Sequence, residues 1–202
     1  MKLINKLHYI TTSADMAEQA CNGGVKWIQL RLKNVSDVYY YNVAKDVHAI
    51  CKKYDATFII NDNVQLALEL KADGVHIGKE DTSPQDARAI LGNGFIIGST
   101  ANTIEDVTKL SKMPIDYIGL GPYRFTDTKQ NLSPVLGLKG YNDIFNSTNY
   151  IKMPPIIAIG GIRLEDTVSI LSTGVYGIAV SGAITFAPNI EEAAKSFILQ
   201  IG

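Results

Sequence analysis

Polar and charged residues gather in this sequence at points where apolar, β-branched runs end. The main groups are Gln29 to Lys33, Asn61-Asp62, His76 to Asp81, Gly119 to Lys129, and Gly160-Gly161. In a parallel sheet with helical crossovers, every strand delivers its carboxyl end to the same rim. We therefore expect these groups, although far apart in sequence, to form one functional site.

The first group predicts an anion site. Side chains alternate along a strand, so Gln29, Arg31 and Lys33 share one face while Leu30 and Leu32 share the other. Two inward-facing cations at the mouth of a sheet favour a bound anion, and the donor fork of arginine matches phosphate oxygens. A solvated strand end, in which Arg31 and Lys33 pair with carboxylates, remains the alternative.

The second and third groups predict a magnesium site. Asp62 and Asp81 end two runs that we expect to be neighbouring strands. Two carboxylates beside a polyphosphate would repel it, whereas a bridging Mg²⁺ accepts oxygens from both protein and phosphate. Asn61-Asp62 alone is a weak signal, because such residues commonly cap helices.

Two glycine-containing turns predict a monophosphate site. Gly160-Gly161-Ile162 and Val180-Ser181-Gly182 follow the last two apolar runs of the chain. In barrels of alternating strands and helices, backbone N–H groups and a helix N-terminus at this position often hold a phosphate. Each motif alone could be only a tight turn, but their joint placement favours the phosphate site.

A long connection, residues 121–139, has no clear periodicity and predicts an active-site lid. Loops of this length in an economical domain are usually functional. Within it, Lys129 together with Thr126 and Thr128 would reach toward the same mouth.

The elements that must position these residues alternate between strand and helix patterns. We expect strands over residues 7–12, 26–32, 57–61, 74–77, 95–99, 117–120, 155–159 and 177–180. We expect helices to begin near Ser13, Ser36, Val64, Ser83, Thr103, Tyr141, Leu164 and Ile190. Eight units of about 25 residues predict an α/β fold, a single-domain (β/α)8 TIM barrel over residues 1–202. A doubly wound open sheet is the alternative.

Composition limits the class of protein. The chain has 202 residues, 46% hydrophobic content and a formal net charge of -1, so a general nucleic-acid binder is disfavoured. Cys21 and Cys51 form no metal-binding or disulfide pattern, and we expect two buried thiols. With no membrane-spanning stretch or signal segment, we expect a cytoplasmic protein that contacts neither membrane nor nucleic acid. Homo-oligomerisation stays open.

Taken together, the motifs resemble those of the thiamine phosphate synthase family. The segments are QLRLK, IINDN, KADGVHIGKED, GST, DYIGLGPYRFTDTK, AIGGI and GIAVSGAI, in the family's order and near its spacings. The resemblance covers nearly the whole chain. It implies a Mg²⁺-assisted transferase that condenses 4-amino-2-methyl-5-hydroxymethylpyrimidine diphosphate with 4-methyl-5-(2-hydroxyethyl)thiazole phosphate, or its carboxylated form. The products would be thiamine phosphate and diphosphate.

The resemblance also implies roles for individual residues. Asp62 and Asp81 would hold Mg²⁺ on the diphosphate. Gln29 and Ser99 would orient the pyrimidine. Further contacts to the diphosphate would come from Asn61, Arg31, Lys33 and Lys129, and the thiazole phosphate would be bound by Thr126, Thr128, Gly161, Ser181 and Gly182. Arg31, Lys33 and Lys129 would act catalytically by stabilising the departing diphosphate in a dissociative substitution.

Some positions depart from the family pattern. Arg124-Phe125 stands where an aromatic-proline pair is usual, and Lys79 replaces a customary glutamine and would add a charge near the metal. Similar thiazole tautomerases have a histidine near Ala101, which this chain lacks. A tautomerase-like isomerase and a non-catalytic barrel that binds thiamine precursors are the alternative functions.

Overall fold

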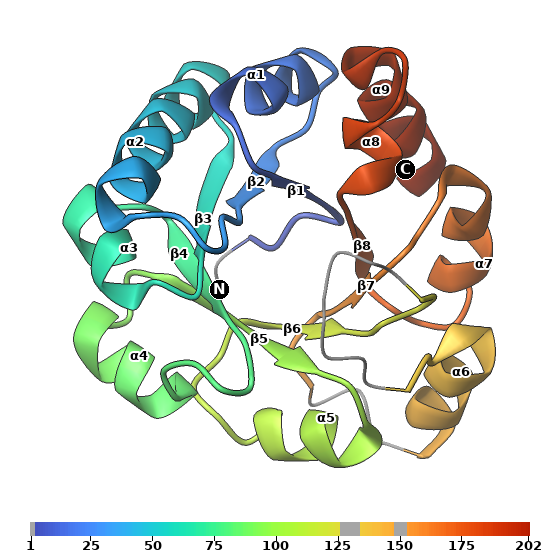
Figure 1. The fold of residues 1–202 in the computed structure, drawn as a ribbon. Helices are drawn as coiled ribbons and strands as arrows, with labels where there is room; N and C mark the ends of the chain where they lie inside the picture. Colours follow the sequence, from blue (N-terminus) through green and yellow to red (C-terminus); the bar gives the residue numbers. More distant parts are fainter. Residues whose placement is uncertain (1–2, 126–133, 148–152) are drawn as a thin grey trace.

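Eight parallel strands form a closed barrel with the helices outside it, in a computed structural model of the chain that describes residues 3–125, 134–147 and 153–202 (Figure 1). Each strand pairs with its neighbours in sequence, and β8 pairs with β1 to close the ring. The predicted TIM barrel is therefore confirmed, and the open sheet is excluded.

The strands are short and buried. They are β1 (Leu7–Thr11), β2 (Trp27–Leu30), β3 (Thr57–Asn61), β4 (Gly74–Ile77), β5 (Ile96–Ala101), β6 (Tyr117–Leu120), β7 (Ile156–Ile159) and β8 (Gly177–Val180). The predictions for the third, fourth, sixth and eighth strands have these bounds. The second was predicted too long at its carboxyl end, and the fifth ended two residues too early.

The helical segments are α1 (Ala14–Asn22), α2 (Asp37–Tyr54), α3 (Val64–Leu70), α4 (Pro84–Leu91), α5 (Ile104–Leu110), α6 (Gly137–Ser147), the 3₁₀ turn η2 (Leu164–Asp166), α7 (Thr167–Leu171), α8 (Gly182–Thr185) and α9 (Ile190–Ile201). Side chains of Ser13, Ser36, Ser83 and Thr103 cap the helices that follow them, as the predicted starts required. Helix α6 begins at Gly137 rather than near Tyr141, and the four-residue α8 was not predicted.

Alternation along the strands separates two apolar layers. Large side chains such as Trp27, Ile59 and Tyr117 fill the barrel interior, and a larger cluster packs between strands and helices. His8 stacks on Trp27 in the interior with ring centroids 4.0 Å apart. Burial, followed by the charge of His76, lowers the pKa of His8 to about 3, so this imidazole is neutral at physiological pH. The filled interior leaves open only the rim at which the strands end.

The two cysteines are free and buried, as expected. Burial raises the pKa of the Cys21 thiol to about 11, so this group is protonated at neutral pH. None of the helices in the described ranges combines the length and apolar character that crossing a bilayer requires.

Candidate functional site

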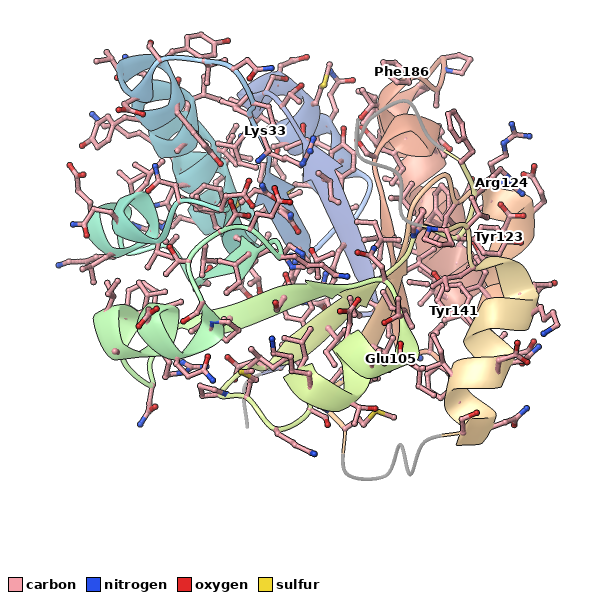
Figure 2. All side chains as sticks on the ribbon, turned by 60° about the horizontal axis from the view of Figure 1, so that its bottom comes forward. Lys33, Glu105, Tyr123, Arg124, Tyr141 and Phe186 are labelled. Atoms are coloured by element: carbon pink, nitrogen blue, oxygen red, sulfur yellow. The ribbon has the colours of Figure 1, made fainter. Side chains whose placement is uncertain are left out.

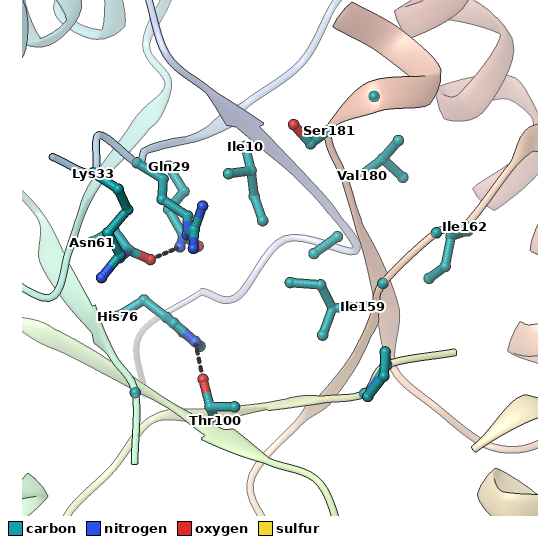
Figure 3. A pocket seen from close by; sticks show the side chains of 18 of the residues that line it. Ile10, Gln29, Lys33, Asn61, His76, Thr100, Ile159, Ile162, Val180 and Ser181 are labelled. Carbon is teal, nitrogen blue, oxygen red and sulfur yellow. Dashed lines mark hydrogen bonds between the residues drawn. The ribbon is translucent and has the colours of Figure 1, made fainter. Parts of the chain in front are cut away.

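A pocket of about 520 Å³ opens at the carboxyl ends of the strands (Figure 3). The predicted site residues that line it are Gln29, Arg31, Lys33, Asn61, Asp62, Asp81, Gly161, Ser181 and Gly182. They follow or end strands β2, β3, β4, β7 and β8. The convergence expected from the strand ends therefore occurs for these residues.

Asp62 and Asp81 lie against each other at one side of the pocket. Burial raises the pKa of the Asp81 carboxyl, and its hydrogen bond to the Asp62 carboxyl raises it further. The Gly78 N–H, 2.9 Å from Asp81 Oδ2, opposes this shift. Within the described residues no group of three or more His, Cys, Asp or Glu side chains could hold a metal, so this is a two-carboxylate site. Adjacent carboxylates of this kind suit a hard divalent cation that removes their repulsion.

The backbone forms a tight turn at Asp62, directly after β3. Asp62 has a φ of 64°, in the left-handed region that aspartate tolerates better than most residues. Its N–H donates to the carbonyl of His76 at 2.8 Å, and the Asn63 N–H donates to the carbonyl of Asn61 at 2.8 Å. Such tight three-residue turns carry strain and cluster at functional sites.

Arg31 and Lys33 differ in their partners. Lys33 forms an ion pair with Asp62. For this residue the structure therefore shows the alternative given above, a cation paired with a carboxylate. The Arg31 side chain makes no hydrogen bond or ion pair with any described residue, although it lines the pocket. Strand β2 ends at Leu30, so the predicted alternation of side chains continued past the end of the strand. The Arg31 N–H nevertheless donates to the carbonyl of Thr11 at 3.0 Å, as in the sheet. Among the described residues the Arg31 guanidinium thus has no partner, and it lines the same pocket as the acidic pair.

Gln29 and Asn61 form a buried amide pair. Gln29 Nε2 donates to Asn61 Oδ1 at 2.8 Å (Figure 3). The Tyr40 hydroxyl donates to the backbone carbonyl of Asn61 at 3.0 Å. The bond between the two amides orients both side chains and leaves the Gln29 carbonyl oxygen and the Asn61 amino group for a ligand. One acceptor and one donor side by side suit a heteroaromatic ring with an exocyclic amine.

The structure does not bring Ser99, which was expected to orient the pyrimidine, to the pocket. On β5, Ile96 packs in the barrel interior while Ile97 and Ala101 pack toward the helices, and Ser99 shares the latter face. Ser99 is buried but does not line the pocket, whereas Thr100 does.

Thr100 belongs to a polar pocket floor that the sequence analysis missed. Its Oγ1 lies 3.0 Å from His76 Nε2 (Figure 3), and His76 Nδ1 lies 3.0 Å from the Tyr117 hydroxyl. His76 is thus the hydrogen-bonded structural histidine of the floor. The strand predicted over residues 95–99 stopped one residue before Thr100, which the observed β5 includes.

The glycine turn after β7 and the start of α8 lie on the other side of the pocket. Gly160 and Gly161 have φ values of 103° and 66°, which L side chains rarely adopt. Four amides around these turns donate to no other described residue; they belong to Gly161, Ile162, Gly182 and Ala183. Unpaired N–H groups converging with the start of a helix form a cradle for a phosphate.

Three predicted residues, Thr126, Thr128 and Lys129, lie outside the described residues, as does the part of the predicted lid over residues 126–133. Lys79 was expected to add charge near the metal, but its ammonium group pairs with Asp106 on α5. Arg163 lines the pocket beside the glycine turn and was missed, because a single arginine after a turn carries no motif.

Comparison with known proteins agrees with this geometry. A family model described as thiamine monophosphate synthase matches residues 3–184. The thiamine-phosphate synthase of Flavobacterium psychrophilum is 48% identical over 194 residues, covering 93% of this chain and 94% of that protein. The thiamine-phosphate synthase of Bacteroides fragilis is 49% identical over 185 residues, covering 91% of each.

A solved structure supports the same relationship. The thiamine phosphate pyrophosphorylase of Pyrococcus furiosus superposes with a TM-score of 0.86 at 32% identity, covering 97% of this chain and 95% of that one. Family model, relatives and structure all cover most of the chain. The chain therefore belongs to the thiamine monophosphate synthase family, and it is a transferase of thiamine biosynthesis.

Proposed function

We propose that this chain joins 4-amino-2-methyl-5-hydroxymethylpyrimidine diphosphate to 4-methyl-5-(2-hydroxyethyl)thiazole phosphate, releasing diphosphate and thiamine phosphate. The observation that carries the proposal is the Arg31 guanidinium, which has no partner among the described residues and lines the same pocket as the adjacent carboxylates Asp62 and Asp81. On another side of the pocket, amides that donate to no described residue offer a second, separate anion site. Two anion sites in one pocket fit a reaction between a diphosphate and a monophosphate.

Asp62 and Asp81 would hold a Mg²⁺ ion, since two adjacent carboxylates at one wall match the oxygen ligands this ion prefers. When bound, the ion would supply positive charge to the diphosphate. Lys33, released from Asp62, and Arg31 would bind the diphosphate oxygens and stabilise their charge as the C–O bond breaks. Lys129 and Asn61 remain predicted contacts to the same group.

The pyrimidine would lie on the amide pair and the pocket floor. Gln29 would present its carbonyl oxygen to the ring's amine, and the role first predicted for Ser99 passes to Thr100, which lines the pocket. A ring held in this way stabilises the cation left when diphosphate departs, until the thiazole nitrogen attacks it. No protein nucleophile is needed, and catalysis rests on alignment and electrostatics.

The thiazole phosphate would lie on the opposite side, where Gly161, Ser181 and Gly182 offer backbone and hydroxyl donors. Thr126 and Thr128 remain predicted contacts from the lid over residues 121–139. The thiazole ring would then extend from this turn toward the pyrimidine, so that the two reacting atoms meet in the middle of the pocket.

The test is thiamine phosphate formation from both substrates with Mg²⁺, with and without a chelator. Asp62→Asn and Asp81→Asn should lower the metal-dependent rate by more than the roughly 10–100-fold typical of changes around a metal's ligands. Asparagine tolerates the left-handed backbone at position 62, so folding should be preserved. Asp46→Asn, an exposed carboxylate on α2, is the matched control and should leave the rate unchanged.

Other outcomes would replace the proposal. Isomerisation of the thiazole phosphate alone would indicate a tautomerase, and binding of both compounds without product would indicate a sensor. Equal rates for Asp62→Asn, Asp81→Asn and Asp46→Asn would remove the metal role from the acidic pair.

A further inference from the structure

Arg124 lies next to the pocket without lining it. It belongs to residues 122–125, which follow β6 and run beside the end of β7 on the side of the barrel opposite Lys33 (Figure 2). The Tyr123 N–H donates to the carbonyl of Ile159 at 2.8 Å, and the Arg124 N–H donates to the carbonyl of Gly160 at 2.9 Å. The backbone of this segment therefore extends the pairing of β6 with β7 up to the glycine turn.

The Arg124 guanidinium makes three hydrogen bonds to the turn and to Asp166. Its Nη1 donates to the Gly161 carbonyl at 2.7 Å and to Asp166 Oδ2 at 2.8 Å, while Nη2 donates to Asp166 Oδ1 at 2.8 Å. The group also lies over the Tyr123 ring, 5.2 Å from its centroid. A forked contact to a carboxylate of this kind fixes both partners in orientation as well as in distance.

Asp166 continues the contact to the far end of the turn. Its Oδ2 accepts the Arg163 N–H at 2.9 Å, and the residue is 8% exposed. The turn is thus held at the Gly161 carbonyl by Arg124 and at the Arg163 amide by Asp166. Between the Gly160 carbonyl, which accepts the Arg124 N–H, and the Arg163 amide lie the amides of Gly161 and Ile162, which donate to no other described residue.

The two glycines do not fix the shape of this turn by themselves. Gly160 and Gly161 can occupy both halves of φ space, so their positive φ values need outside contacts to become the single conformation. Packing supplies part of that constraint, since a Cβ built on Gly161 would lie 3.0 Å from Arg124 Cβ and 3.1 Å from the Phe125 carbonyl oxygen. The polar contacts of Arg124 supply the rest.

We propose that Arg124 and Asp166 are positioning residues that hold the turn Gly160-Gly161-Ile162 with its free amides toward the phosphate of the thiazole substrate. The inference rests on the proposed function, which assigns that phosphate to this turn. It also gives a role to Arg124, which departs from the aromatic-proline pair usual in the family.

The consequence is a selective effect on one substrate. Replacing Arg124 with Met keeps the aliphatic stem and removes the hydrogen bonds to Asp166 and Gly161. Arg124→Met should raise the KM for the thiazole phosphate about 10-fold. An effect of this size is typical when a group that orients the ligand-binding residues is removed. The KM for the pyrimidine diphosphate should change by less than about 2-fold, because Arg124 contacts none of the residues on that side. Arg124→Lys, which can restore one donor, should recover part of the loss.

A second Arg–Asp pair provides a matched control. Arg88 Nη2 lies 2.7 Å from Asp116 Oδ2, and Arg88 also donates to the carbonyls of Phe95 at 2.7 Å and Gly92 at 2.9 Å. This pair lies where β5 and β6 begin, at the opposite end of the barrel. Arg88→Met removes comparable bonds, so it should lower the unfolding midpoint but leave both KM values unchanged.

Binding of inorganic phosphate separates the inference from the proposed function. The amide signals of Gly161 and Gly182 are followed by ¹⁵N NMR during phosphate titration of wild type, Arg124→Met, Arg124→Lys and Arg88→Met. We expect shifts of both signals in wild type and Arg88→Met, and a weakened response at Gly161 in Arg124→Met, with Arg124→Lys in between.

Other results would overturn one claim or both. Equal phosphate affinity and equal KM for wild type and Arg124→Met would reject the positioning role while leaving the proposed function intact. If phosphate and the thiazole phosphate both leave these amides unshifted in wild type, the proposed phosphate site fails and the inference fails with it. Should Arg124→Met not fold, Arg124→Lys decides by the same comparison.

Discussion

At the scale of single residues, Thr100 and Ser99 are adjacent hydroxyl side chains with opposite surroundings. Thr100 Oγ1 lies 3.0 Å from His76 Nε2 at the pocket floor, while Ser99 is 3% exposed on the face that packs toward the helices. If the pyrimidine rests on this floor, the Thr100 hydroxyl is part of its binding surface, and Ser99 contributes only to packing.

This difference predicts different kinetics for two small substitutions. Thr100→Val keeps the side-chain shape and removes a hydroxyl, so the KM for the pyrimidine diphosphate should rise about 3- to 10-fold, the value of one neutral hydrogen bond. Ser99→Ala should leave both KM values unchanged. Steady-state kinetics with each substrate varied in turn measures both effects, and impairment of Ser99→Ala alone would reverse the assignment.

That Ser99 lies away from the pocket could not be read from the sequence, for a physical reason. In a parallel barrel both faces of a strand are buried, so the sequence around Gly98-Ser99-Thr100 gives no polar–apolar alternation that identifies the inner face. At Gln29 and Arg31 the polar residues alternate with leucines, and there the predicted face agrees with the pocket lining. The pairing of Lys33 with Asp62 and of Lys79 with Asp106 could not be read from sequence, because it depends on loop geometry.

At the scale of elements, β5 and β6 fit together through a glycine. A Cβ built on Gly98 would lie 2.1 Å from the Tyr117 ring, and that ring is buried in the barrel interior beside His8 and Trp27. The strand therefore needs glycine at this position for close approach of the tyrosine rather than for an unusual φ.

Gly98→Ala should consequently destabilise the barrel. Overpacking of a filled interior lowers the free energy of unfolding by about 1–3 kcal/mol. Because the new Cβ would meet a rigid ring, we expect the loss for Gly98→Ala to lie at or above the upper end of this range. Gly94→Ala, whose new Cβ would meet nothing within 4 Å, should change the unfolding free energy by less than about 0.5 kcal/mol. Urea unfolding of both variants measures the contrast, and equal midpoints would show that Tyr117 can move aside.

Element prediction succeeded where capping and periodicity were both present. Helices α1, α2, α4 and α5 begin directly after the Ser or Thr caps from which they were predicted. Helix α8 has four residues, too few for a 3.6-residue period to be visible, and its position was indicated only by the Ser181-Gly182 turn. The long connection after β6 was recognised, but not that α6 already begins at Gly137.

At the scale of the whole molecule, the closed barrel places the two proposed anion sites on opposite sides of one pocket. Arg31 and the acidic pair come from β2, β3 and β4, whereas the glycine turn and α8 follow β7 and β8. The chain as a whole carries a formal charge of -1, so attraction for two phosphate-bearing substrates is local to the pocket. Eight repeated strand–helix units predicted this arrangement, because a parallel barrel fixes which end of every strand faces the site. The single domain over residues 1–202 and the lid over residues 121–139 stay predictions.

The central claim is that Asp62 and Asp81 together hold a divalent ion against a departing diphosphate. Crystals grown with Mn²⁺ and inorganic diphosphate test it directly, because the anomalous signal of manganese locates the ion. We expect one peak bonded to both carboxylates and to diphosphate oxygens, with Lys33 moved from Asp62 to the diphosphate and Arg31 contacting the same group. A diphosphate bound in the pocket without an ion between these carboxylates, or an ion bound elsewhere, would contradict the account.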